Sequence, residues 1–297
     1  MKLKSPFLIK PHSKVKLSAF PTATHPGYSS EAATKAVLDK HRQQLTDLQE
    51  VLYASQAKAV LIVLQGMDTA GKDGTIRHIF SGINPQGCDV ASFKVPTPVE
   101  AHHDFLWRCH AQVPARGMIG IFNRSHYEDV LSPWVHGQTS DKIARRRMDN
   151  IVGWERMLAD QDVVILKFFL HISHAEQTRR LQSRIDTPDK RWKISPADFE
   201  ERKFWDKYMS AYEEILRRTS RKHAPWFVIP SDHKWFRNVA ISQILVEGMQ
   251  ALNLKYPAPT FDPKGIDLAE ESAAVVAKKV KQRANPGAPK SAANTKE

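Results

Sequence analysis

The chain has 297 residues, of which 41% are apolar, so it is long enough to bury a sizeable core. Its two cysteines cannot form a disulfide framework and its longest apolar runs are too short to span a bilayer, so we expect a cytoplasmic protein without a membrane segment. The net charge of +12 comes mostly from the ends, because residues 1–24 and 276–297 each carry a net charge of +5. Such ends are commonly solvated, so the charge alone does not indicate a nucleic-acid partner.

Strand-like and helix-like patterns alternate along the chain. Residues 1–30 are rich in Pro and Lys and are expected to form an extended arm, and 31–58 has the apolar spacing of an amphipathic helix. Five apolar, β-rich runs follow, at 58–64, 88–95, 117–122, 162–170 and 226–230, separated by helical patterns at 72–82, 98–110, 141–159, 174–185, 196–219 and 235–252. This order predicts one α/β domain over 31–257, with a parallel sheet covered by helices on both faces. Residues 258–297 are expected to be a largely disordered tail, with at most one helix at 267–283.

The sequence GMDTAGKDGTI (66–76) follows the first apolar run and opens a helix, as a phosphate-binding loop requires. Glycines permit tight turns whose N–H groups converge on phosphate oxygens, the helix N-terminus adds a positive dipole end, and Lys72 adds a full charge. The candidate phosphate-binding residues of this loop are Gly66, Ala70, Gly71, Lys72, Asp73, Gly74 and Thr75.

Two carboxylates stand in this anion-binding loop. Asp73 occupies the position of the usual Ser or Thr, and its alternatives are a substrate role or simple complementarity to the helix dipole. Asp68 lies where a transferred phosphoryl group passes, so it would hold Mg²⁺, orient an acceptor phosphate, or cap a loop N–H. We favour the first two roles for Asp68.

The third strand ends in the sequence FNRSHYEDVL (122–131). Asn123 stands at the strand end, where a metal-binding acid is common in enzymes with such loops, and Arg124 follows with a guanidinium suited to clamping phosphates. Glu128 or Asp129 would replace the missing acid or cap the next helix. His126 is a candidate substrate contact.

Residues 179–193 are strongly basic and interrupted by a Pro-containing turn, which predicts a hinged helical lid at about 179–219. Its cations either neutralise a bound polyanion or form a solvated face; they are Arg179, Arg180, Arg184, Lys190, Arg191 and Lys193. Lys234 follows the fifth strand, on the same edge of the sheet as the loop, and is a further candidate phosphate contact.

In combination, these motifs resemble the polyphosphate kinase 2 family over residues 31–255. The resemblance rests on GMDTAGKDG (66–74), SGINPQGCDVASFKVPTPVE (81–100), FNRSHYEDVL (122–131), residues 180–216 and PSDHKWFRN (230–238), in the family's order. It implies a P-loop kinase-like α/β/α sandwich with a five-stranded parallel sheet and a helical lid. It also implies reversible transfer of the terminal phosphoryl group of inorganic polyphosphate to a nucleotide, with Asp68, Lys72 and Arg124 as the catalytic residues.

The third-strand motif Asn-Arg-Ser-His-Tyr-Glu and the loop start Gly-Met-Asp resemble the subgroup that phosphorylates both AMP and ADP. This resemblance implies an acceptor site at Asn123, His126 and Glu128, and Mg²⁺, with Mn²⁺ as an alternative, held by Asp68 and Glu128. It further implies adenine nucleotides as substrates, with other purine nucleotides as alternatives, and a homodimer or homotetramer without nucleic-acid or membrane partners.

Two rival functions remain at this point. An ATP-dependent nucleoside monophosphate kinase would share the core, but it predicts Ser or Thr after Lys72, where this chain has Asp73. A basic nucleic-acid-binding protein would use the two charged ends and would not need the loop.

Overall fold

The sheet explains the spacing of the apolar runs. In the computed structural model, which describes residues 4–262, five parallel strands are arranged in the order β2-β3-β1-β4-β5. The strands are β1 (Ala59–Gln65), β2 (Cys88–Ser92), β3 (Ile119–Asn123), β4 (Val163–His171) and β5 (Trp226–Pro230). The central strand β1 is buried on both faces, which is why its sequence is continuously apolar. The structure confirms the predicted α/β fold with a five-stranded parallel sheet.

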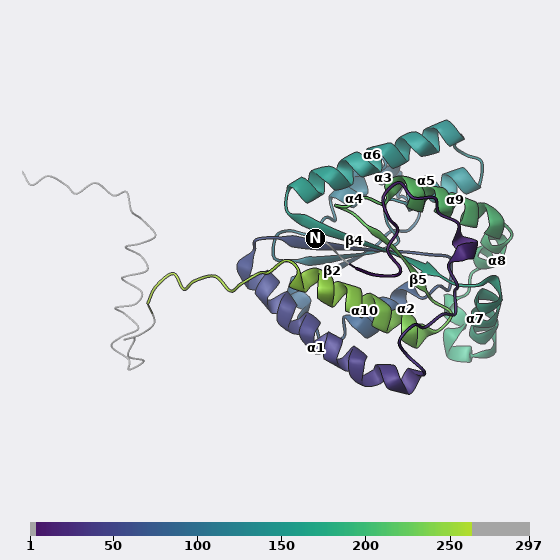
Figure 1. The fold of residues 1–297 in the computed structure, drawn as a ribbon. Helices are drawn as coiled ribbons and strands as arrows, with labels where there is room; N and C mark the ends of the chain where they lie inside the picture. Colours follow the sequence, from purple (N-terminus) through teal and green to yellow (C-terminus); the bar gives the residue numbers. More distant parts are fainter. Residues whose placement is uncertain (1–3, 263–297) are drawn as a thin grey trace, which may run out of the picture. The chain divides into compact units, whose positions relative to one another are not determined.

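Helices form a layer on each face of the sheet (Figure 1). In chain order they are η1 (Leu17–Ala19), α1 (Glu31–Ser55), α2 (Lys72–Ile79), η2 (Pro85–Gly87), α3 (Pro98–Ala101), α4 (Trp107–His110), α5 (Glu128–Val135), α6 (Asp141–Asp160), α7 (His174–Asp186), η3 (Pro188–Lys193), α8 (Pro196–Arg202), α9 (Trp205–Thr219) and α10 (Lys234–Gln250). Helices α1, α2 and α10 pack with one face of β1 through Val60, Ile62 and Leu64, and α5, α6 and α9 pack with the other through Leu61 and Val63.

Several predicted boundaries are wrong, for local reasons. The helix expected at 98–110 is two short helices: Thr97 and Glu100 cap the start of the first, and between the two the Asp104 carboxylate accepts a hydrogen bond from Leu106 N. The second strand ends at Ser92, before the proline-containing segment that leads to α3. Helix α5, which contains Pro133, was not among the predicted helices. The helix expected at 267–283 and the tail beyond residue 262 lie outside the described residues.

The N-terminal arm is packed against the sheet. It extends along the edge strand β5, where Ile9 N donates to Trp226 O and Val228 N donates to Phe7 O, each at 2.9 Å. The Ile9 side chain is buried. Pairing of this kind protects a sheet edge from other chains. Residues up to Tyr256 form one compact unit, and no helix in residues 4–262 is long and apolar enough to cross a bilayer.

A buried ion pair lies behind the carboxyl end of the sheet. Lys167, in the middle of β4, donates to the Glu155 carboxylate at 2.6 Å, to the Tyr127 hydroxyl at 2.8 Å and to Thr219 O at 2.9 Å, and its side chain is fully buried. Tyr127 in turn donates to Glu155 at 2.8 Å. Burial raises the pKa of Glu155, but the charge of Lys167 and the hydrogen bonds from His126 and Lys167 together bring that pKa below its usual value. The network fixes the turn between β3 and α5.

We expect Lys167 and Glu155 to be tolerated in the core only when both are present. Glu155→Leu leaves the Lys167 charge buried without its carboxylate, so the free energy of unfolding should fall by about 3–5 kcal/mol. The double variant Glu155→Leu/Lys167→Met removes both charges and should regain most of that loss, as measured by urea denaturation. A double variant as unstable as the single one would contradict this account.

Candidate active site

The loop that joins β1 to α2 is tightly folded at the carboxyl edge of the sheet. Helix α2 begins at Lys72, as the motif predicts, and Gly71 precedes it with a φ of 105°. A Cβ atom on Gly71 would lie 1.9 Å from Nη1 of Arg237, and one on Gly66 would lie 2.8 Å from Leu170 O. Gly66 is therefore required by the close approach of the Leu170 backbone, and Gly71 by its left-handed φ.

Lys72 places a positive charge inside this loop. Its ammonium group donates to Gly66 O at 2.8 Å and lies 3.4 Å from Met67 O, so the side chain folds back across the loop. Burial, and next the charge of Arg124, lower the pKa of Lys72 to about 8. The side chain lines a cavity of about 540 Å³ together with the first turn of α2, whose N–H groups have no partner within the helix.

The second feature is an ion cluster around Arg124, directly after β3. The Arg124 guanidinium donates to Asp68 Oδ1 at 2.6 Å and lies 3.6 Å from Glu128 Oε2. Arg124 has a φ of 62°, a left-handed conformation that costs a non-glycine residue roughly 1 kcal/mol. Burial raises the pKa of Glu128. The side-chain amide of Gln65, in the orientation in which both its nitrogen and its oxygen have a hydrogen-bond partner, donates to the Glu128 carboxylate. A strained backbone thus holds a cation between two acids.

Asp73 has a separate partner. It lies in the first turn of α2, and Asn123 Nδ2 donates to its carboxylate at 2.6 Å. This bond ties the loop to the end of β3. Asp73 therefore combines helix-start complementarity with a contact to a predicted acceptor residue, so the two alternatives for it remain compatible.

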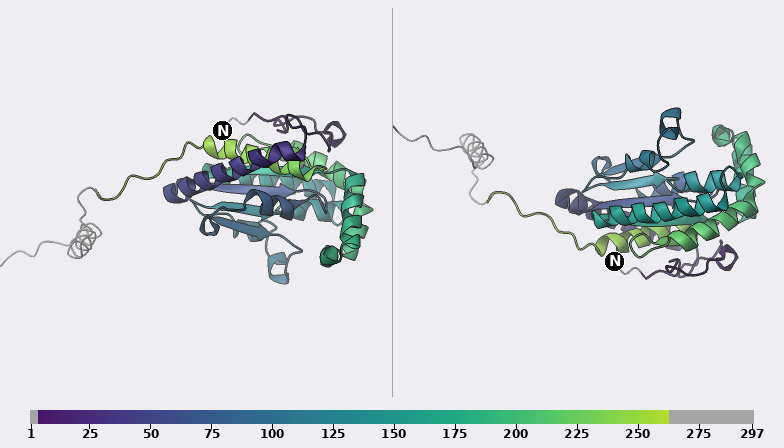
Figure 2. Two further views of the ribbon diagram at one scale, coloured as in Figure 1. Left: turned by 90° about the horizontal axis from the view of Figure 1, so that it is seen from below. Right: turned by 90° about the horizontal axis from the view of Figure 1, so that it is seen from above.

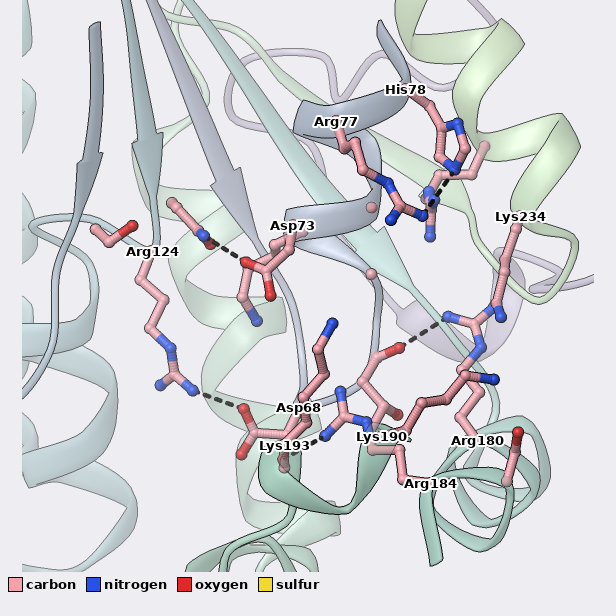
Figure 3. Close-up of a pocket in the computed structure, with 18 of the residues that line it drawn as sticks. Asp68, Asp73, Arg77, His78, Arg124, Arg180, Arg184, Lys190, Lys193 and Lys234 are labelled. Atoms are coloured by element: carbon pink, nitrogen blue, oxygen red, sulfur yellow. Dashed lines mark hydrogen bonds and ion pairs between the residues drawn. The ribbon is translucent and has the colours of Figure 1, made fainter. Parts of the chain in front are cut away.

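The wall of the cavity is overwhelmingly cationic (Figure 3). The acidic residues that line it are Asp68 and Asp73. The cations come from α2, α7, η3, α10 and the β2 and β3 exits: Lys72, Arg77, Lys94, Arg124, Arg179, Arg180, Arg184, Lys190, Lys193, Lys234 and Arg237. Helices α7 and α8 with η3, here called the lid segment, project to the same side of the sheet as the segment around α3 (Figure 2). Such a wall fits a ligand with many negative charges.

One predicted lid cation also has a structural task. Arg180 is 6% exposed and donates to the Glu176 carboxylate at 2.6 Å, to Thr69 O at 2.9 Å and to Ala70 O at 3.0 Å. It also donates to the carbonyl oxygens of Ser231 and Asp232. Arg180 lines the cavity, but its guanidinium ties the lid segment to the loop through these bonds, so its predicted contact with a polyanion stays a prediction.

Other predicted contacts need correction. His126 is fully buried, with Nε2 3.3 Å from Glu155 Oε1, so it cannot contact an acceptor here. Arg191 donates to Ile185 O and does not line the cavity. The hydroxyl and N–H of Thr75 both donate to Gly71 O, and Ala70 N donates to Met67 O, so neither residue offers these groups to a phosphate.

Two acids near the third strand are now distinguished. Asp129 forms a two-oxygen pair with Arg108, at 3.1 and 2.9 Å, outside the cavity, so it does not replace the strand-end acid. Glu128 lies behind Arg124 and does not line the cavity. The sequence reasoning missed Arg77, which is three positions after Gly74 on the same helix face, and Arg237, which lies three positions after Lys234.

Comparisons with known proteins agree with this geometry. The family model of polyphosphate kinase 2 matches residues 28–257. The AMP/ADP-polyphosphate phosphotransferase of Meiothermus ruber is 48% identical over 254 residues, covering 85% of this chain and 95% of the relative. The ADP-polyphosphate phosphotransferase of Rhodopseudomonas palustris is 44% identical over 273 residues, covering 88% and 94%.

A solved structure extends the likeness to the fold. The crystal structure of polyphosphate kinase 2 from Arthrobacter aurescens TC1 superposes with a TM-score of 0.84 at 40% identity, covering 91% of this chain and 95% of that one. The family model spans the arm's end, the sheet, the loop and the lid segment. The chain therefore belongs to the polyphosphate kinase 2 family.

Proposed function

We propose that this protein transfers the terminal phosphoryl group of inorganic polyphosphate to AMP and ADP, and that the transfer is reversible. The observation that carries the proposal is the distribution of charge around the loop. Cations from several elements line the cavity, whereas its lining acids, Asp68 and Asp73, are close to Arg124 and Asn123 at the β3 exit. A polyanionic donor would lie along the cations, and the acceptor phosphate would enter at the β3 exit.

The chemistry would be an in-line displacement. A terminal phosphate oxygen of the nucleotide forms a bond to the end phosphorus of the chain, and the bond from that phosphorus to its bridging oxygen breaks. The negative charge that develops on the leaving oxygen would be stabilised by Lys72 and by the N–H groups at the start of α2. No covalent enzyme intermediate is needed, because positioning and charge neutralisation supply the rate.

Arg124 would change partners during substrate binding. In the free protein its charge is neutralised by Asp68 and Glu128. An arriving phosphate competes for the same guanidinium, because Arg binds phosphate and carboxylate through the same pair of N–H groups. Once Arg124 contacts phosphate, the oxygens of both carboxylates become available.

Mg²⁺ is the cofactor that suits these two acids. Among residues 4–262, no group of three or more His, Cys, Asp or Glu side chains could hold a metal by itself. Mg²⁺ typically binds through one or two carboxylates plus substrate phosphates and water, so Asp68, which lines the cavity, would hold it jointly with the substrates, and Glu128 would join it once Arg124 contacts phosphate. When bound, Mg²⁺ would neutralise the charge on the transferring group. Mn²⁺ would be accepted by the same oxygens.

The rival functions fit the structure less well. An ATP-dependent nucleotide kinase would have a Ser or Thr hydroxyl directly after the loop lysine. Here that position is Asp73, whose carboxylate accepts a hydrogen bond from Asn123. A nucleic-acid-binding role for the basic arm is weakened because the arm is packed along β5 and Lys16 pairs with Glu213 at 3.0 Å. The cytoplasmic location and the homo-oligomeric state stay predictions.

The direct test is an assay of the purified protein with Mg²⁺, long-chain polyphosphate and either AMP or ADP. We expect ADP and ATP from AMP, and ATP from ADP, with phosphorus traced by ³¹P NMR. Omission of polyphosphate should abolish product even when ATP is added as the donor for AMP. If neither acceptor is phosphorylated, the proposed function is wrong.

Asp68→Asn should separate catalysis from folding. The amide keeps the shape of the side chain but loses the charge that pairs with Arg124 and would hold Mg²⁺, so we expect the transfer rate to fall by roughly 100-fold or more. The matched control is Asp160→Asn, because Asp160 is an exposed acid of α6 that pairs with Arg156. The control should keep full activity and both variants should melt near the wild-type temperature. Near-normal transfer by Asp68→Asn would refute its assigned role.

A further inference from the structure

Two buried arginines meet beneath the phosphate-binding loop. Arg180, from the lid segment, and Arg237, from α10, both donate to the carbonyl oxygen of Ala70, at 3.0 and 3.1 Å. Their exposed fractions are 6% and 1%. The two residues are thus both buried arginines with one hydrogen-bond partner in common. A difference in their remaining partners therefore indicates a difference in role.

The difference is the counter-ion. Arg180 has the Glu176 carboxylate at 2.6 Å. The remaining bonds of Arg237 go to the neutral amide oxygen of Asn238, at 3.2 and 2.9 Å, and among residues 4–262 no carboxylate forms an ion pair with it. A buried charge without a partner is destabilising by several kcal/mol, so its presence calls for a reason.

The loop is built to admit this charge. A Cβ atom added to Gly71 would lie 1.9 Å from Arg237 Nη1, and one added to Gly74 would lie 3.4 Å from Arg237 Nη2. Arg237 also lines the cavity itself. The guanidinium is therefore in contact with the backbone that starts α2, and the first residues of that helix line the cavity.

The surroundings of Arg237 add positive charge. Burial and the nearby charge of Arg180 lower the pKa of Arg237 to about 9, so it remains a cation at neutral pH. Lys234 and Arg77 line the same cavity, and burial, followed by the charges of Arg77 and Arg237, lowers the pKa of His78. Glu176, the acid of Arg180, is already shared with Arg179. Within residues 4–262, therefore, no carboxylate supplies the negative charge that Arg237 lacks.

We propose that Arg237 is a substrate-binding residue whose counter-ion is a phosphate group of the bound donor chain. The inference rests on the proposed function and adds a consequence to it. In the free protein, no carboxylate of residues 4–262 pairs with this buried charge, and donor binding offsets the cost of burying it. Arg237 therefore couples donor affinity to protein stability, whereas Arg180 stabilises the loop in all states.

The test compares Arg237→Met, which keeps the side-chain volume, with Arg237→Lys, which keeps the charge. The matched control is Arg156→Met, at an exposed arginine of α6 outside the cavity. Binding of linear tripolyphosphate is measured by titration calorimetry in metal-free buffer, and the melting temperature is measured with and without it. The KM values for polyphosphate and AMP are measured with Mg²⁺.

Free Arg237→Met should melt no lower than the wild type, and it should bind tripolyphosphate roughly 10- to 100-fold more weakly. Its KM for polyphosphate should rise while that for AMP stays unchanged. Arg237→Lys should regain part of the affinity, and Arg156→Met should match the wild type.

Two results would overturn the inference. The first is an Arg237→Met protein that binds tripolyphosphate as tightly as the wild type and still performs polyphosphate-dependent transfer. That result would refute the role of Arg237 but leave the proposed function intact. The other is an Arg237→Met protein that is unfolded or melts well below the wild type, because the charge would then stabilise the free fold. Absence of polyphosphate-dependent transfer in the wild type would instead refute the proposed function on which the inference rests.

Discussion

The structure depends on holding several positive charges around one tight loop before any anion has arrived. Lys72 is buried within the loop, Arg180 and Arg237 are buried beneath it, and Arg124 is strained beside it. Like charges at such short range repel strongly in a low-dielectric interior. The chain offsets this repulsion only in part, with Asp68 and Glu128 at Arg124 and Glu176 at Arg180. The imbalance that remains favours a ligand rich in negative charge.

The rest of the fold fixes the positions of these charges. The parallel sheet brings the carboxyl ends of β1 and β3 together, and the buried pair of Lys167 and Glu155 holds the turn after β3 from behind. At the other end of the sheet edge, the Asp232 carboxylate accepts hydrogen bonds from Thr22 of the arm, at 2.7 Å, and from Ser173 N at the start of α7, at 2.8 Å. Arm, lid segment and loop are thus joined at the exit of β5.

Local sequence was a good guide to the strands and the loop, because apolar runs and glycine spacing reflect burial and backbone geometry directly. It was a poor guide to the tasks of individual charged residues. Arg180, Arg184 and Lys190 belong to one basic run, yet only the fold shows that Arg180 is used internally. His126 lies in the third-strand motif but faces the core, and Arg237 was passed over for Lys234. Such assignments depend on contacts between residues far apart in the sequence.

The most direct test of this account is a crystal structure of the protein with AMP, Mg²⁺ and a non-hydrolysable methylene analogue of polyphosphate. The account predicts the phosphates along the cationic wall, with one against Arg237, and the Arg124 guanidinium moved from Asp68 to a phosphate oxygen. An analogue bound elsewhere on the surface, with the 2.6 Å pair between Arg124 and Asp68 intact, would contradict it.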